Sequence, residues 1–149
     1  MAEAVLNHRI SQRQDLKGKI DFHVDSAGTG AYHAGDEADD RTIATCRKHK
    51  IPISCIARKV TNADFAKFDY IIAMDQSNLQ TLLNRQPASS RSHIALFGSF
   101  DPALANSYDA KKGRAIDDPY YGGSDGFEKC YQQCIVYADG LLDYIEKHV

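Results

Sequence analysis

The segment that most constrains the fold of this chain is Phe68–Met74, a short apolar run rich in residues that favour β-strands. Such a run is typical of a buried strand. Asp75 follows it directly, and Ser77–Leu83 reads as a helix. A buried strand followed at once by a helix favours a sheet of parallel strands, because parallel strands need crossover connections.

Further segments repeat this alternation of strand and helix. Apolar and polar residues alternate over residues 19–24, as in a half-buried strand. Apolar residues recur at helical spacing over residues 127–148, which marks this segment as the longest helix. Together these patterns predict an α/β fold in which ligands lie beyond the carboxyl ends of the strands, in the loops after Val24, Met74 and Phe97. We expect strands at 19–24 and 93–97, helices at 1–8, 39–49 and 127–148, a turn at 64–68 and a long loop at 98–126.

Length and composition indicate one soluble domain spanning residues 1–149. Hydrophobic residues make up 43%, charged residues 26%, and the net charge is −2, so nothing calls for nucleic acid as a partner. No run approaches the roughly 18 apolar residues that span a bilayer, and the first ten residues do not resemble a signal peptide. We therefore expect a cytoplasmic protein without membrane contact.

The four cysteines are expected to be reduced thiols. They are Cys46, Cys55, Cys130 and Cys134, and no histidine or cysteine cluster completes a zinc pattern around them. We expect no metal and no cofactor.

Several motifs occur in one order along nearly the whole chain. The most specific is Asp117-Asp-Pro-Tyr-Tyr-Gly-Gly123 followed by a helix that begins with an aromatic residue; the others are Met1-Ala-Glu-Ala-Val5, Val24-Asp-Ser-Ala-Gly-Thr29, Ile56-Ala-Arg58, Asp64-Phe65, Phe68-Asp-Tyr-Ile71, Ala73-Met-Asp75 and Ser77-Asn-Leu79. In these motifs the chain resembles the low-molecular-weight protein tyrosine phosphatase family. The resemblance implies a three-layer α/β fold, a short parallel sheet with helices on both faces. It also implies hydrolysis of protein phosphotyrosine, or of small aryl phosphates, through a cysteinyl-phosphate intermediate without a cofactor.

One part of the family pattern is not found in this sequence. The family opens with a strand and a phosphate-binding loop, Cys-(five residues)-Arg-Ser-Pro, which Met-Ala-Glu-Ala-Val normally follows. The sixth position after each cysteine here holds Pro52, Thr61, Val136 or Gly140, and never arginine. We therefore expect a chain that lacks the first strand and the nucleophile loop, is inactive as written, and derives from a truncated gene model or transcript.

The resemblance assigns roles in the reaction to the acid-loop segment and to two aromatic walls. Asp118 matches the general acid that protonates the leaving tyrosyl oxygen. Tyr120 and Tyr121 match the crevice wall that stacks on phosphotyrosine, and Tyr32 with His33 match the opposite wall. The alternatives are a turn aspartate before Pro119, ordinary packing of the tyrosine pair, and an exposed histidine without a role.

Two further residues match supporting positions of the family. Ser26 matches a serine that braces the phosphate loop, and Asp75 matches a member of a buried polar network with a histidine. Cys55 stands where that histidine is expected, so Asp75 is equally well read as the N-cap of the following helix. Arg41 and Arg58 are carried over as structural charges without a catalytic role.

Two functional classes follow from these expectations. The first is a tyrosine phosphatase whose nucleophile loop is absent from this chain. The second is a pseudophosphatase that binds phosphoproteins or other partners through the tyrosine-lined wall. The sequence of the transcript upstream of Met1 distinguishes them, because an in-frame Cys-(five residues)-Arg-Ser-Pro there supports the first class.

Overall fold

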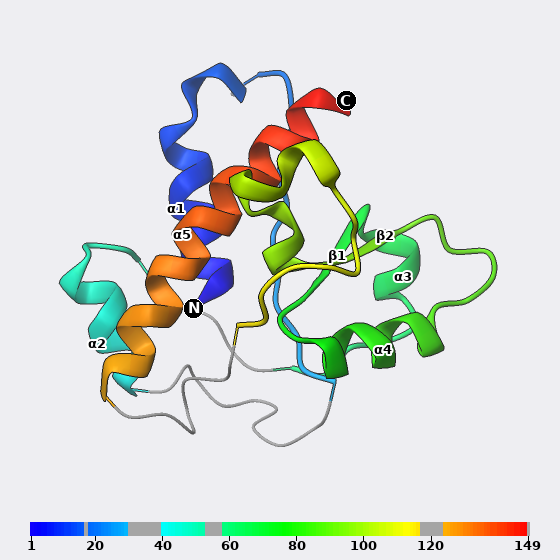
Figure 1. The fold of residues 1–149 in the computed structure, drawn as a ribbon, viewed down its shortest axis with the longest axis horizontal. Helices are drawn as coiled ribbons and strands as arrows, with labels where there is room; N and C mark the ends of the chain where they lie inside the picture. The colour runs from blue at the N-terminus through cyan, green and yellow to red at the C-terminus, as the bar shows by residue number, and fades with distance from the viewer. Residues whose placement is uncertain (17, 30–39, 53–57, 117–123, 149) are drawn as a thin grey trace.

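The centre of the molecule is a pair of parallel strands joined by a helical crossover (Figure 1). The computed structural model describes residues 1–16, 18–29, 40–52, 58–116 and 124–148. Within these ranges β1 (Tyr70–Ala73) pairs with β2 (His93–Leu96), with Tyr70 opposite His93 and Ala73 opposite Leu96. The helix α4 (Gln76–Arg85) connects them. The predicted α/β fold with a short parallel sheet is confirmed.

The alternation of side chains along the strands divides the core into two clusters. Ile94 and Leu96 belong to one cluster and Ala95 belongs to the other, because successive strand residues point to opposite faces. The first cluster is covered by α4 and by the short helix α3 (Asp64–Lys67). The second is covered by helices from three distant parts of the chain: α1 (Ala2–Gln12), α2 (Asp40–Lys48) and α5 (Ser124–Lys147). The sheet therefore has helices on both faces.

The helix α5 organises the larger cluster. Its buried face includes Cys134, Ala138 and Leu142, which recur at helical spacing, and α1 runs beside it (Figure 1). Arg9 on α1 donates to both carboxylate oxygens of Asp139, at 2.8 and 3.0 Å. The pair is partly buried near the surface, where ion pairs contribute only about 0–1 kcal/mol each, so apolar burial is the main stabilising term.

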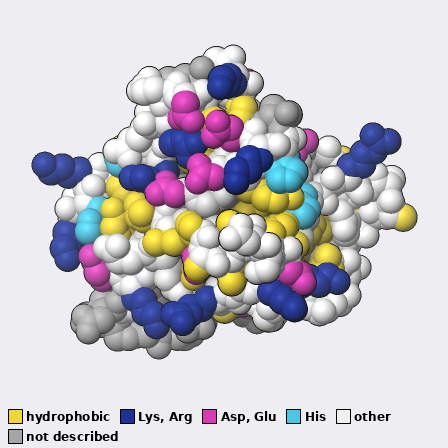
Figure 2. Space-filling model, turned by 45° about the horizontal axis from the view of Figure 1, so that its top comes forward, with side chains coloured by type: hydrophobic (Ala, Val, Ile, Leu, Met, Phe, Trp, Pro, Cys, Tyr) yellow, Lys and Arg dark blue, Asp and Glu magenta, His cyan; other side chains and the backbone are white. Residues whose placement is uncertain are grey.

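Charges on the surface are mixed in sign. Figure 2 shows acidic and basic side chains next to one another on the upper part of the face that it displays. Arg13, at the end of α1, lies 3.0 Å from both Asp143 and Glu146 and links the end of α1 to the end of α5. None of the helices in the described ranges is long and apolar enough to cross a membrane.

The strand predicted at 19–24 is wrong. Residues 20–27 form no regular secondary structure, and the first ladder contact after them is an isolated parallel bridge between Gly28 and Lys59. Alternating residues favour an extended backbone, but a strand also needs a neighbour whose N–H and C=O groups match it in register. Within the described ranges no strand stands beside residues 20–27 to supply that ladder.

The long loop predicted at 98–126 contains more structure than expected. Two 3-10 helices, η2 (Phe97–Phe100) and η3 (Pro102–Ser107), follow β2. Elsewhere in the chain, a third 3-10 helix, η1 (Gln14–Leu16), follows α1. The carboxylate of Asp101 accepts from the amide of Ala103 at 3.0 Å, and Pro102 has the backbone angle of a first helical residue, so η3 begins with a cap. The turn predicted at 64–68 is wrong, since Asp64–Lys67 form the short helix α3. The remaining α-helices differ from their predicted bounds by a few residues at the ends.

Close approach of α5 to η2 depends on Gly140. A β-carbon at this position would stand 1.7 Å from the carbonyl oxygen of Phe100, which is backbone and has little freedom to move. Glycine inside a helix normally costs about 1 kcal/mol relative to alanine. Its presence here is explained by the contact rather than by helix propensity.

We therefore expect Gly140→Ala to destabilise the protein by about 1–3 kcal/mol, opposite in sign to the usual gain in a helix. Urea denaturation followed by circular dichroism measures this change. Val136→Ala, one turn earlier and 42% exposed, is the matched control and should change stability by less than about 0.5 kcal/mol. A Gly140→Ala variant as stable as the parent would show that α5 does not approach η2 so closely.

An aromatic cluster joins the amino ends of both strands to the end of α5. The ring of Tyr144 stacks on the rings of His93 and His148, with centroids 5.8 and 4.0 Å apart. The ring of Tyr70 meets the ring of Tyr144 edge-on, with centroids 6.3 Å apart. Nε2 of His93 lies 2.7 Å from the hydroxyl oxygen of Tyr108, and burial raises the pKa of Tyr108 to about 12. Burial, and secondarily the nearby His148, lower the pKa of His93, so the fold favours its neutral form.

The free energy of unfolding should therefore fall as the pH drops below about 6.5, the usual pKa of an unfolded histidine. In the window between that value and the lowered folded pKa of His93, the unfolded chain binds more protons, so stability rises with pH. His93→Gln should reduce this slope in urea denaturation at pH 5 to 8. His8→Gln, on α1, is the control and should keep it; equal slopes for both variants would contradict the assignment to His93.

Candidate active site

The carboxyl end of β1 is the best-defined edge of the predicted site. After Met74, the backbone of Asp75 is extended, and its carboxylate accepts from the amide of Asn78 at 2.7 Å. Its carbonyl oxygen accepts from Leu79 at 3.0 Å. Asp75 is therefore the N-cap of α4, as one of the two interpretations predicted. A further part in a buried network stays a prediction, because Cys55 lies outside the described residues.

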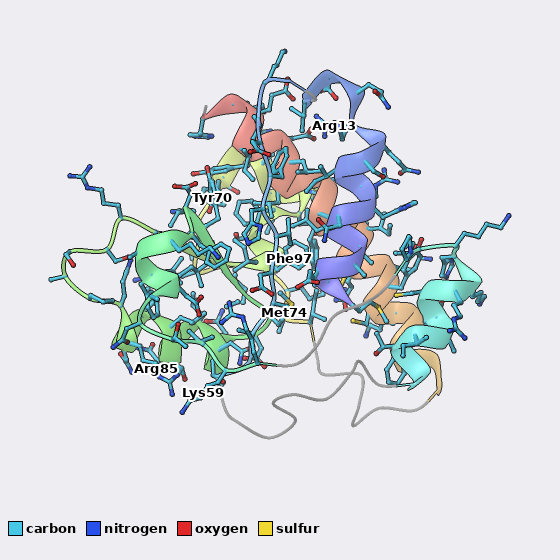
Figure 3. The ribbon with its side chains drawn as sticks, turned by 180° about the vertical axis from the view of Figure 1, so that it is seen from behind. Arg13, Lys59, Tyr70, Met74, Arg85 and Phe97 are labelled. Atoms are coloured by element: carbon cyan, nitrogen blue, oxygen red, sulfur yellow. The ribbon has the colours of Figure 1, made fainter. Side chains whose placement is uncertain are left out.

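A second segment is attached to the same edge of the sheet. The amide of Ile116 donates to the carbonyl oxygen of Met74 at 2.8 Å, and the side chain of Ile116 is only 3% exposed. Figure 3 shows Met74 near the middle of the molecule, between the two groups of helices. The segment that leads to Asp118 is thus attached to the carboxyl end of β1 at Ile116, two residues before Asp118.

The predicted general acid and the predicted residues of the two walls lie outside the described residues. These are Asp118, Tyr120 and Tyr121 between Ile116 and α5, and Tyr32 and His33 between Thr29 and α2. Their predicted roles stay predictions. The structure does describe the residues that precede each segment: Ile116 is held by Met74, and the carbonyl oxygen of Thr29 accepts from Nη2 of Arg85 at 3.3 Å.

Ser26 lies in a short loop, residues 25–29, that we call the Ser26 loop. The amide of Ser26 donates to Oδ1 of Asp25 at 2.8 Å. Two backbone hydrogen bonds fix the loop further along: the amide of Gly28 donates to the carbonyl oxygen of Arg58 at 2.8 Å, and the amide of Val60 donates to that of Gly28 at 2.9 Å. The side chain of Ser26 is exposed, and its bracing role stays a prediction.

Arg58 contacts two carboxylates, which the sequence did not reveal. Its Nε lies 3.0 Å from Oδ2 of Asp25, and its Nη1 and Nη2 lie 3.0 Å from the two oxygens of Asp64. The hydrogen bonds from Arg58, helped by the amide of Thr61, hold the pKa of Asp64 below its usual range. The sequence indicated only a structural charge at Arg58, because nothing in the spacing places Asp25 beside it.

The described cysteines are poor candidates for a nucleophile. Cys46, Cys130 and Cys134 form no disulfide in the described ranges, and all three are buried in the core. Burial raises the pKa of Cys46, and a hydrogen bond with Cys130 followed by burial raises the pKa of Cys134. Nucleophilic attack requires the thiolate, which a raised pKa disfavours. In the part of the chain that the structure describes, no three histidine, cysteine or acidic side chains are grouped to hold a metal.

Comparison with known proteins assigns this architecture to one family. A family model described as low molecular weight phosphotyrosine protein phosphatase matches residues 1–149. A relative of that name from Schizosaccharomyces pombe is 40% identical over 146 residues, which cover 97% of this chain and 87% of the relative. The one from Homo sapiens is 39% identical and covers 96% of this chain and 85% of its own length.

The fold agrees with this assignment. A crystal structure of a protein tyrosine phosphatase from Entamoeba histolytica superposes with a TM-score of 0.84 at 33% sequence identity, covering 99% of this chain and 88% of that chain. The predicted resemblance of the fold is confirmed. The chain therefore belongs to the low molecular weight phosphotyrosine protein phosphatase family.

Proposed function

We propose that the reaction for which this chain is built is the hydrolysis of phosphotyrosine in proteins, and of small aryl phosphates, with Asp118 as the general acid. The observation that carries the proposal is the hydrogen bond between Ile116 and Met74, at 2.8 Å. It anchors the segment that leads to Asp118 at the carboxyl end of a parallel strand, where α/β proteins bind their ligands.

In this reaction a cysteine thiolate attacks phosphorus and the bond to the tyrosyl oxygen breaks. Asp118 gives its proton to that oxygen, so that a neutral phenol leaves. Water then hydrolyses the cysteinyl phosphate. Tyr120 and Tyr121 on one wall, and Tyr32 with His33 on the other, would hold the aromatic ring of the substrate. Ser26 would brace the phosphate loop, and Asp75 would take part in a buried polar network.

We further propose that the 149-residue chain does not catalyse this reaction by itself. No cysteine in its sequence has an arginine at the sixth following position, and the three described cysteines are buried. The nucleophile and its phosphate-binding arginine would belong to a longer cytoplasmic product of the same gene, of which residues 1–149 form the single domain apart from its first strand.

A second candidate is a pseudophosphatase that binds phosphoproteins or other partners. It is favoured by the same missing motif, because a chain that keeps the Asp-Pro-Tyr-Tyr segment without a nucleophile retains only the means of binding. The transcript sequence upstream of Met1 separates the two candidates.

The purified 149-residue chain should not hydrolyse p-nitrophenyl phosphate above the buffer rate at pH 5.5. Loss of the nucleophile costs about 10⁶ in turnover in another hydrolase, the serine protease subtilisin. The assay is the release of p-nitrophenol, with vanadate inhibition to reveal contaminating phosphatases. A vanadate-sensitive turnover that copurifies with the chain through two different columns would contradict the proposal.

An extended protein, with a family-type strand and Cys-(five residues)-Arg-Ser-Pro segment ahead of Met1, should be active, and Asp118→Ala should slow it selectively. The loss should be greatest for aryl phosphates whose leaving groups have a high pKa, because these depend most on protonation. The measurement is kcat for a series of substituted phenyl phosphates. Asp117→Ala serves as the matched control and should not steepen the dependence on leaving-group pKa. An equal loss for every leaving group would exclude Asp118 as the acid.

A further inference from the structure

We propose that Arg58 is the positioning residue of the Ser26 loop, holding Asp25 against the anchored carboxylate of Asp64; its part in catalysis rests on the function proposed above. The sequence pattern does not predict either carboxylate partner of Arg58, because Asp25 is 33 residues away along the chain and Asp64 is six residues away. The tertiary structure brings the three side chains together.

One end of the arrangement is fixed in the core. Asp64 is the first residue of α3 and is only 9% exposed, and Phe65 beside it belongs to the buried cluster under α4. The carboxylate of Asp64 accepts from the amide of Thr61 at 2.8 Å and from two nitrogens of Arg58. The position of Asp64 is therefore held by contacts other than its hydrogen bonds with Arg58.

The other end acts on the backbone next to Ser26. Arg58 donates through Nε to Oδ2 of Asp25, and Oδ1 of the same carboxylate accepts from the amide of Ser26. Each oxygen of Asp25 thus has a partner among the described residues, and the position of Arg58 orients the carboxylate. That orientation in turn fixes where the Ser26 amide lies.

The geometry requires a guanidinium rather than any positive charge. A guanidinium is planar, and its two Nη groups can donate two parallel hydrogen bonds to one carboxylate. Its Nε–H can at the same time donate to a second carboxylate. The ammonium of lysine is a single point charge and cannot meet both aspartates in this way. Lysine at position 58 would keep the charge and lose the bridge.

Other contacts hold the far end of the Ser26 loop but not its beginning. Gly28 bridges Lys59, and Arg85 donates to the carbonyl oxygen of Thr29. Figure 3 shows Lys59 and Arg85 near each other on the side of the molecule where these contacts are made. Among the described residues, Arg58 makes the contact that constrains Asp25 from outside the loop.

The test compares Arg58→Lys with Arg13→Lys in the 149-residue chain. Arg13 is a matched control, since it also bridges several carboxylates, Asp15, Asp143 and Glu146, but lies at the ends of α1 and α5. Amide hydrogen exchange measured by NMR should show the Ser26 amide exchanging about tenfold faster in Arg58→Lys and unchanged in Arg13→Lys. Asp25→Asn, at an exposed position, breaks the same link without touching Asp64 and should have the same effect on Ser26. Unchanged exchange in Asp25→Asn and Arg58→Lys would overturn the proposal.

An activity measurement separates positioning from general support of the fold. In the extended protein described above, Arg58→Lys should lower kcat by about tenfold and change KM by less than about twofold, because a displaced loop affects the reacting geometry. Arg13→Lys should change neither. An unchanged kcat in Arg58→Lys would overturn the assignment even if Ser26 becomes mobile. An extended parent protein without activity would instead contradict the proposed function, and hydrogen exchange would then decide the contact on its own.

Discussion

The parallel pairing of β1 with β2 is the constraint on which the rest of the structure depends. Parallel strands point their carboxyl ends to one edge, so Met74 and Phe97 leave the sheet on the same side. The same pairing sends Ile94 and Leu96 to one face and Ala95 to the other. Ala95 is fully buried and belongs to the larger cluster, which α1, α2 and α5 cover. The two layers of helices, and the edge of the sheet at which we propose the site, thus follow from a single ladder.

Backbone hydrogen bonds, together with apolar packing and ion pairs, join segments that are far apart in the sequence. Ile116 attaches to Met74, and Gly28 attaches to Arg58 and Val60, in each case through N–H and C=O groups. Because these hydrogen bonds join backbone groups, they do not depend on which side chains stand at these positions. The residues at which the loops begin can therefore stay in place when the loop side chains change. The proposed chemistry needs this property, since an acid and a substrate wall must come from different segments and meet at one place.

The arginines illustrate how burial of a partner changes the role of an ion pair. Arg13 and Arg58 each bridge more than one carboxylate. The partners of Arg13 are exposed and belong to helix ends, where screening by water leaves little net energy. One partner of Arg58 is buried at the start of α3, so this arginine can transmit a fixed position to an exposed loop. The same residue type is a surface charge in one place and a structural link in the other.

The sequence by itself determined the elements whose signals are local. The apolar run at 68–74, the helical spacing of Phe127–His148 and the family motifs were sufficient for the α/β class, the approximate helices and the family, because short-range periodicity and composition record which face of an element is buried. The sequence also determined which residue types are available for chemistry, including the absence of an arginine six positions after any cysteine. Only the tertiary structure decided whether residues 19–24 form a strand, since a ladder requires a neighbour in register. It also decided that Asp75 caps α4 and that Arg58 joins Asp25 to Asp64, because hydrogen bonds between distant residues depend on how the chain folds back, which no local pattern records.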